Sequence, residues 1–278
     1  MTKFAEFLRN MTMAGKFAFL GIVIVILLGI LAPAIAPHSP HDQDITRKFK
    51  KVDGYPLGCD ELGRCVLSRL LYGARLSLTI ALFARLLAIL VGVAVGLTAG
   101  YFGGAIDWTL MRLADIFLAF PSLLLAIAIS MVMDSSVQTV IFAIAASGWA
   151  EIAKITRASA MELKTKEYVT VAKTFGAGDF RIIMTHILPN AMPVITVVFT
   201  MGIASAVLTE ASLSYLGMGV PPELPTWGGM VNAGKDYLIA YPAAVFYPGL
   251  AIAFLVIVFN LFGDELRDAM DPARRVNL

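Results

Sequence analysis

The chain of 278 residues is 58% hydrophobic and only 15% charged. A soluble domain is nearer half apolar and about one quarter charged, so this composition excludes an ordinary soluble fold and predicts that the chain buries apolar surface in lipid. The net charge of +2 is too small to suggest a nucleic-acid partner, and no basic run is interleaved with aromatic residues.

Residues 1–36 are predicted to form a cytoplasmic N-terminus and a first transmembrane helix over residues 17–36. That uncharged run is long enough to cross a hydrocarbon core of about 30 Å. A secretory signal is the competing interpretation, because Ala34-x-Ala36 resembles a cleavage site. The run exceeds a typical signal core and Pro37 would follow the cleavage point, so we expect a retained span.

Residues 37–74 are predicted to form an extracytoplasmic loop. Its prolines interrupt regular structure and its charges are mixed. From Leu62 to Leu71 apolar residues recur at helical spacing with polar residues between them. This pattern indicates a short amphipathic helix that lies on the membrane surface before the next span.

Two pairs of residues in this loop have potentially reactive side chains. His38 and His41, with aspartates nearby, have metal-ligand chemistry, but they lack a recognised ligand spacing, and we favour a solvated loop over a metal site. Cys59 and Cys65 pair if the loop faces an oxidising compartment. The alternative is two free thiols that fill small positions.

A second span is predicted over residues 76–100, and it contains Arg85. A cation inside a span costs roughly 2.5–3.5 kcal/mol on insertion scales and often marks a transport pathway. The alternative is that Arg85 lies near the interface or extends its side chain towards it. Gly92, Gly96 and Gly100 recur every four residues, a spacing that favours close packing of helices.

A short inside turn over residues 101–112 is predicted to lead into a third span at about residues 113–133. Asp115 lies at its start and Pro121 lies within it. A proline in a span frees a backbone carbonyl, which must find a partner or line an aqueous cavity. Both residues are therefore pathway candidates, like Arg85. A fourth span follows over residues 137–156.

Residues 151–193 carry six of the 22 Lys and Arg residues, a density that places most of this segment outside hydrocarbon. A helix over residues 161–175 is predicted to end at a Gly-Ala-Gly turn. Asp179 is then predicted to cap a second helix that runs to Pro189. A basic helix-turn-helix at the face of a membrane domain indicates a docking surface.

A fifth span is predicted over residues 190–209, with Glu210 at its outer end as the fourth pathway candidate. Residues 211–225 are rich in Gly and Pro and predict irregular backbone. A sixth span begins near Pro242 and ends at residue 263. The chain is thus an all-α integral membrane protein with six transmembrane helices. The distribution of Lys and Arg predicts that both termini and the docking loop are cytoplasmic.

The docking loop resembles the "EAA" loop of permease subunits in ATP-binding-cassette importers. A trio of residues, a glycine and a Leu-Pro pair have the family spacing at Thr170-Val171-Ala172, Gly176 and Leu188-Pro189. Thr170 and Val171 stand where Glu and Ala are usual. Three further stretches resemble the dipeptide, oligopeptide and nickel branch, namely residues 57–69 with 72–75, Asp115 with Phe120-Pro121, and residues 210–217.

The resemblance implies a type I importer transmembrane domain over residues 75–264 and a cytoplasmic tail over residues 265–278. It implies that a coupling loop at about residues 158–189 seats on a separate ATPase through Glu167, Tyr168, Thr170, Ala172, Lys173, Gly176 and Ala177. The implied partners are a second homologous permease, two ATP-binding subunits or domains, an extracytoplasmic substrate-binding protein and the lipid bilayer. The implied location is a bacterial or archaeal plasma (inner) membrane.

The chain has no Gly-x-x-x-x-Gly-Lys-Ser/Thr phosphate cradle, so we expect no enzymatic activity and no bound cofactor, with ATP and Mg on the partner subunits. The expected cargo is short peptides. A nickel or nickel-chelator permease is the alternative, because Gly63-Arg64-Cys65 stands where Gly-Arg-Asp is usual. A stand-alone secondary transporter is a further alternative, but such carriers show repeated halves, which this chain lacks.

Overall fold

The structure, a computed structural model, describes residues 11–270, and within that range the chain is helical without named strands. Five helical runs are long and apolar enough to cross a membrane: α2 (Met13–Ile35), α3 (Val66–Phe102), α6 (Val137–Leu163), α8 to α9 (Asp179–Tyr215) and α11 (Ala243–Met270). The pair α4 (Gly104–Leu118) and α5 (Ser122–Val132) provides a sixth, bent by 84°. The prediction of an all-helical membrane fold is confirmed.

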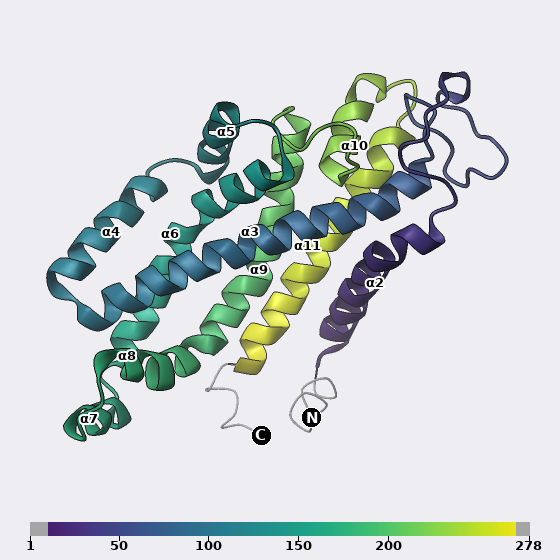
Figure 1. The fold of residues 1–278 in the computed structure, drawn as a ribbon. Coiled ribbons are helices and arrows are strands. Elements are labelled where there is room, and N and C mark those ends of the chain that lie inside the picture. Colours follow the sequence, from purple (N-terminus) through teal and green to yellow (C-terminus); the bar gives the residue numbers. More distant parts are fainter. Residues whose placement is uncertain (1–10, 271–278) are drawn as a thin grey trace.

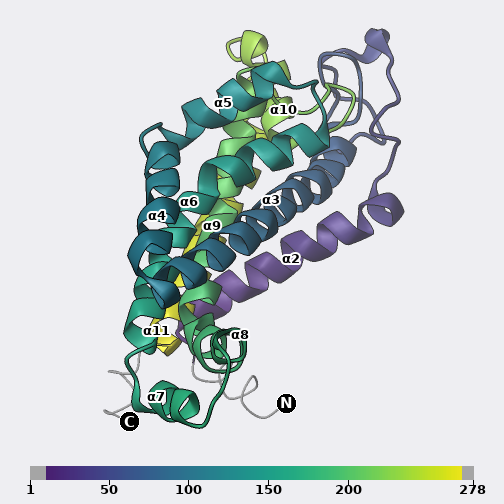
Figure 2. The same ribbon diagram turned by 60° about the vertical axis from the view of Figure 1, so that its left-hand side comes forward.

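The helices run between two ends of the molecule (Figure 1). At one end lie the short helices α7 (Glu167–Thr174) and α8 (Asp179–Ile182), which we call the α7 end. At the other end lie α10 (Trp227–Gly234) and the loop of residues 36–65, the α10 end. The start of α2 and the end of α11 both lie at the α7 end (Figure 2), where Thr12 N donates to Glu265 Oε1 at 3.0 Å.

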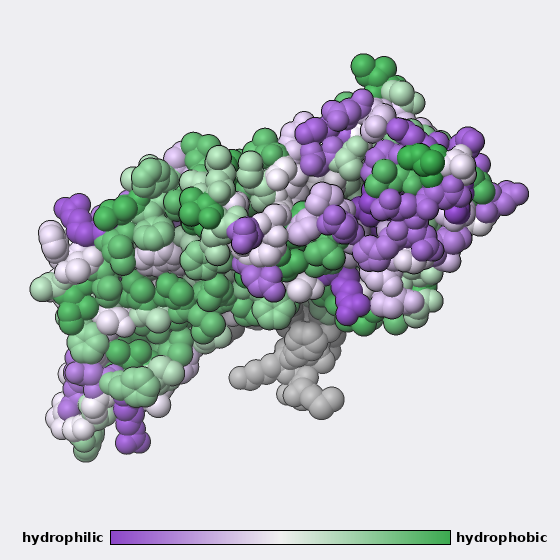
Figure 3. Space-filling model, turned by 45° about the horizontal axis from the view of Figure 1, so that its top comes forward, coloured by the Kyte–Doolittle hydropathy of each residue, from purple (hydrophilic) through white to green (hydrophobic). Residues whose placement is uncertain are grey.

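Apolar side chains cover the middle of the molecule, and hydrophilic ones gather towards its two ends (Figure 3). Leu90 of α3, Ile30 of α2 and Leu250 of α11 are among the exposed apolar residues. Water would disfavour such a surface, whereas hydrocarbon accommodates it. The band therefore marks the part of the chain that lies in the bilayer.

The longest helix, α3, runs between the two ends and packs most extensively against α6. Its 37 residues span about 55 Å at 1.5 Å per residue, so it must tilt or project beyond a core of about 30 Å. Gly92 and Gly100 allow the close approach to α6. A Cβ on Gly92 would lie 2.6 Å from Ile152 Cβ, and one on Gly100 would lie 2.6 Å from Arg157 O.

Several element boundaries differ from the predictions. The surface helix expected from Leu62 to Leu71 is not separate, because α3 begins at Val66 and continues into the membrane. The inside turn expected over residues 101–112 is reduced to Gly103, with φ 68°, after which α4 begins at once. The expected third span is broken near Pro121 instead of running through it.

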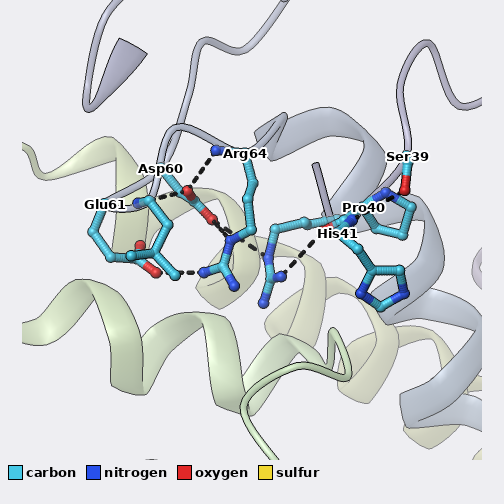
Figure 4. Close-up of polar contacts among 8 residues, drawn as sticks. Ser39, Pro40, His41, Asp60, Glu61 and Arg64 are labelled. Carbon is cyan, nitrogen blue, oxygen red and sulfur yellow. Dashed lines mark hydrogen bonds and ion pairs between the residues drawn. The ribbon is translucent and has the colours of Figure 1, made fainter. Parts of the chain in front are cut away.

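The polar residues at and just before the start of α3 gave this segment an amphipathic pattern, but they contact buried partners and not water (Figure 4). Asp60 accepts hydrogen bonds from Arg64 Nε at 2.7 Å and Arg64 N at 2.8 Å, and it forms an ion pair with Arg69 Nε at 3.5 Å. Arg69 Nη1 also donates to Pro40 O at 3.3 Å. All three charged side chains are nearly fully buried, so this polar face holds the loop in place and does not face water.

The residues with reactive side chains in this loop have structural surroundings. Cys59 and Cys65 face each other across an antiparallel bridge as buried free thiols. Burial raises the pKa of the Cys59 thiol. His38 stacks on Tyr55 with ring centroids 3.9 Å apart. Within residues 11–270, His38 and His41 belong to no group of three or more possible metal ligands.

The α3–α6 contact makes a prediction about glycine substitution. Gly92→Ala should destabilise the protein by about 1–3 kcal/mol, because the new methyl would overlap Ile152 Cβ and Trp149 O. Gly249→Ala in α11 is the matched control, since nothing lies within 4 Å of its Cβ position and alanine favours helices. Thermal unfolding in detergent should show a lower midpoint for Gly92→Ala alone; equal midpoints would contradict the close contact.

Candidate functional site

The short helix α7 ends in a hydrogen-bonded turn built around Gly176. Gly176 N donates to Lys173 O at 2.9 Å, and Ala177 N donates to Ala172 O at 3.0 Å. This pair of bonds is the Schellman motif, which requires a left-handed residue after the helix, and Gly176 has φ 78°. The sharp exit expected at Gly176 is therefore present.

Two other predictions about this segment were wrong. The helix expected over residues 161–175 is interrupted, since α6 ends at Leu163 and α7 begins at Glu167. Asp179 does not cap the second helix, because Gly178 occupies the N-cap position. That helix also continues through a π-helical turn, Ile183–Ile187, into α9 (Leu188–Tyr215) without a gap.

One face of α7 packs against the membrane domain. Val169 is fully buried, and Ala172 and Ala177 pack beside it against a cluster that contains Leu97, Tyr101, Ala160, Ile182 and Ile187. Of the residues predicted to touch an ATPase, Ala172 and Ala177 thus face their own chain. The other five, Glu167, Tyr168, Thr170, Lys173 and Gly176, are exposed.

A second face of α7, next to the buried one, presents an apolar surface that the sequence did not single out. Val171 is 52% exposed and Phe175 is 86% exposed, and together with Tyr168 they form what we call the α7 patch. Their spacing of three and four residues places them on one helix face. Phe180, just beyond the turn, is exposed as well. A helical-wheel comparison with buried Val169 would have separated the two faces.

The α7 segment is attached to the last turn of α3. Tyr101 Oη donates to Asp179 Oδ1 at 2.5 Å, and Lys173 Nζ lies 4.8 Å from the centre of the Tyr101 ring. Lys164 Nζ donates to Gly100 O at 2.7 Å, so it caps the carboxyl end of α3. These contacts join α7, from both sides, to the helix that runs through the whole molecule.

The four pathway candidates do not form one site. Arg85 lies beside a cavity between α3, α6 and α9, close to the break that contains Pro121. The polar residues that line this cavity are Arg85, Ser122, Ser147, Glu151, Ser205 and Thr209. Asp115 lies apart on α4, where it pairs with Lys154 Nζ at 2.7 Å and Arg112 Nη1 at 3.8 Å.

Glu210 lies within α9, and not at the outer end of a span where the sequence placed it. It is fully buried, and its carboxylate accepts hydrogen bonds from Ser214 Oγ at 2.8 Å and Ser77 Oγ at 3.3 Å. Ser77 Oγ in turn accepts a hydrogen bond from Trp227 N at 3.2 Å. Glu210 therefore links α3, α9 and α10, and it is absent from the residues lining the cavity near Arg85.

One side of the bundle carries polar groups at positions that a single chain leaves uncovered. Asp115 and Lys154 form their ion pair there. Glu151 lies one turn from Lys154 on α6, and it lines the hollow near Arg85 together with Ser205 of α9; both are exposed. Charged groups are costly in hydrocarbon and usually face a protein interior or water. We call this surface the polar face, and it is suited to water or another subunit and not to lipid.

A helical membrane domain with a polar face and an exposed helix at one end is typical of a transporter subunit. The chain belongs to the family of binding-protein-dependent transport system inner membrane components, whose family model matches residues 92–276. The family membership, the permease character and the inner-membrane location predicted from the sequence are thereby confirmed.

The chain is similar to several curated permeases over nearly its whole length. It is 39% identical to the oligopeptide transport system permease protein OppC of Bacillus subtilis, covering 94% of this chain and 87% of that protein. It is 40% identical to the dipeptide permease DppC of Haemophilus influenzae, with 90% and 88% covered. The glutathione permease GsiD of Pectobacterium atrosepticum is 36% identical, with 98% and 91% covered.

Solved structures share the fold at lower identity. An inward-facing structure of the MetNI methionine transporter has a TM-score of 0.60 and 18% identity, covering 73% of this chain and 96% of that chain. A structure of an amino acid ABC transporter with histidines has a TM-score of 0.52 and 17% identity, with 75% and 94% covered. This likeness supports the type I importer fold, not a substrate.

The buried position of Glu210 makes a second prediction. Glu210→Ala should destabilise the protein by about 1–3 kcal/mol, because it leaves buried hydroxyls at Ser77 and Ser214 without their acceptor. Glu223→Ala removes the same side chain from an exposed position and should change little. Urea or thermal unfolding of both variants in detergent checks this, and equal stabilities would contradict the proposed link between α3, α9 and α10.

Proposed function

We propose that the chain forms half of the translocation pathway of an ATP-driven importer for short peptides and that it couples to a separate ATPase through α7. The observation that carries the coupling is the exposed α7 patch on a helix that is joined to the end of α3. The named cargo of the relatives, oligopeptide, dipeptide and glutathione, supports a peptide substrate.

In this mechanism the α7 patch seats in a groove of the ATPase, and the exposed Glu167 lies at its edge. ATP and Mg bind to the ATPase subunits. When these close on ATP, α7 moves with them as a rigid unit. Because Tyr101 and Lys164 join α7 to α3, the movement reaches the helix that contacts α6 and α9. The two arrangements exchange as populations that ATP binding biases.

The polar face supports a second, homologous permease as partner. Lys154 and Glu151 are exposed in the single chain and Asp115 is half-buried, although all three lie on helices that cross the membrane. Two such faces opposite each other would enclose a polar pathway and remove these charges from lipid. Asp115 is thus assigned to the wall of the pathway, and Pro121 to the break that shapes it.

The proposed orientation places the α7 end in the cytoplasm, where ATP is available, together with both termini. The α10 end then faces outward and receives an extracytoplasmic substrate-binding protein, as the family description implies. Residues 36–65 and α10 are held there by the Asp60 network, so they offer a fixed receiving surface.

The test is ATP-dependent uptake by the complete transporter in proteoliposomes, after co-purification with its neighbours. Uptake of labelled dipeptide that needs the partner subunits supports the proposal. Uptake of nickel in place of dipeptide would favour the nickel alternative. Uptake by this chain alone, driven by an ion gradient, would overturn the proposal in favour of a secondary transporter.

Gly176→Val should uncouple ATP hydrolysis from uptake. A β-branched residue at φ 78° costs roughly 1–3 kcal/mol, so the turn that sets the direction of α7 should rearrange. The control is Gly178→Val, two residues on, where φ is −67° and nothing lies within 4 Å of the Cβ position. Parallel assays of uptake and ATPase activity should show loss of uptake for Gly176→Val alone. Survival of both activities would refute the docking role.

Phe175→Ser should weaken binding of the ATPase about tenfold, because a large aromatic side chain at the centre of an interface often contributes more than 1.4 kcal/mol. Ile239→Ser, at a fully exposed residue near the α10 end, is the matched control. The measurement is affinity of detergent-purified permease for the ATPase subunits. Equal affinities of the two variants would exclude the α7 patch from the interface.

A further inference from the structure

The cavity beside Arg85 is the feature that the coupling mechanism leaves unexplained. Arg85 is close to the middle of α3, and Glu151 is close to the middle of α6. Both line one open hollow between α3, α5, α6 and α9. Within residues 11–270, no ion pair joins Arg85 to an acidic side chain. Two opposite charges at mid-membrane depth thus share a cavity without neutralising each other by direct contact.

The Arg85 guanidinium is fixed in place by its neighbours. Its Nη2 donates to Val198 O at 2.7 Å, and Nη1 lies 3.7 Å from the Cβ position of Gly148. A Cβ on Gly202 would overlap the guanidinium, so only glycine admits it there. Its Nε is buried without a hydrogen-bond partner. Arginine has five N–H donors, and this one contacts a single protein acceptor, which leaves donors for a ligand.

The break between α4 and α5 adds a second positive element. Ser122, the first residue of α5, lines the same cavity as Arg85. The first N–H groups of a helix have no intrahelical acceptor and carry the positive end of the helix dipole. Broken membrane helices use such ends to bind anionic groups of their substrates. Arg85 and the start of α5 therefore form one side of the cavity that favours a carboxylate.

The other side of the cavity is acidic. Glu151 is exposed there, one turn from Ser147, and Ser205 and Thr209 line the wall from α9. A carboxylate favours an ammonium group, and the hydroxyls between the two charges can bond to peptide N–H and C=O groups. A lone metal cation would be repelled by Arg85, and a lone anion by Glu151. A molecule that carries both charges fits best.

We propose that this cavity binds the charged ends of a free short peptide, with Arg85 and the amino end of α5 holding the terminal carboxylate and Glu151 holding the terminal ammonium group. This inference rests on the proposed function and adds that the permease itself, and not only the binding protein, selects for both free termini. The facing permease would close the open side of the hollow.

The test is binding of radiolabelled dialanine to the purified permease–ATPase complex without the binding protein. Unlabelled dialanine, its C-terminal amide and its N-acetyl derivative compete. The wild type should prefer dialanine to either derivative by about tenfold or more. Arg85→Gln should bind dialanine and the amide equally, and Glu151→Gln should bind dialanine and the acetyl form equally. Arg75→Gln, an exposed position on α3, should keep both preferences.

Gly202→Ala keeps every charge but displaces the Arg85 guanidinium. This variant should therefore also lose the preference for dialanine over its C-terminal amide. If Arg85→Gln fails to fold, Gly202→Ala and Glu151→Gln decide the matter. The site would be overturned if the wild type bound dialanine and its two derivatives equally. It would also be overturned if Arg85→Gln weakened binding of dialanine and of the amide by the same factor. Peptide uptake by the complete transporter, measured separately, would show whether the proposed function survives that result.

Discussion

The close approach of α3 to α6 is the contact on which the rest of the structure depends. It requires glycine at Gly92, Gly96 and Gly100, because any side chain there would overlap α6. Lipid offers apolar side chains no less favourable contact than another helix does, so shape and backbone proximity must drive the association. With α3 held this way, a single helix carries the Asp60 network near one end and the α7 attachment at the other.

Polar groups along α3 fix its neighbours at defined depths. Arg69 holds the loop of residues 36–65, Ser77 connects Glu210 to α10, and Tyr101 holds the α7 segment through Asp179. An unpaired polar group in an apolar surrounding is expensive, so each of these pairs resists sliding of one helix past the next. A helix fixed at several depths moves as a unit, which is the property that a coupling mechanism needs.

Hydropathy and local backbone rules predicted the apolar spans and the turn at Gly176, because these features depend on nearby sequence alone. They placed one continuous span across Pro121, where the structure has a break. The burial of Glu210 could not be predicted this way, since it depends on packing against α3, where its partner Ser77 lies far away in the sequence. The same holds for Ala172, whose inward face is decided by contacts with distant helices, and for the exposed Phe175. The start of α3 looked surface-bound because the buried partners of its polar residues lie outside that segment.

The polar residues of the chain divide into two groups that call for different explanations. Asp60 and Glu210 are buried with partners on other segments, so they belong to the scaffold. Glu151, Asp115 and Arg85 lie in membrane-crossing helices but remain partly open in the single chain. A bilayer would not tolerate this second group against lipid. In the proposed assembly, a facing subunit and an aqueous space between the two would cover these groups.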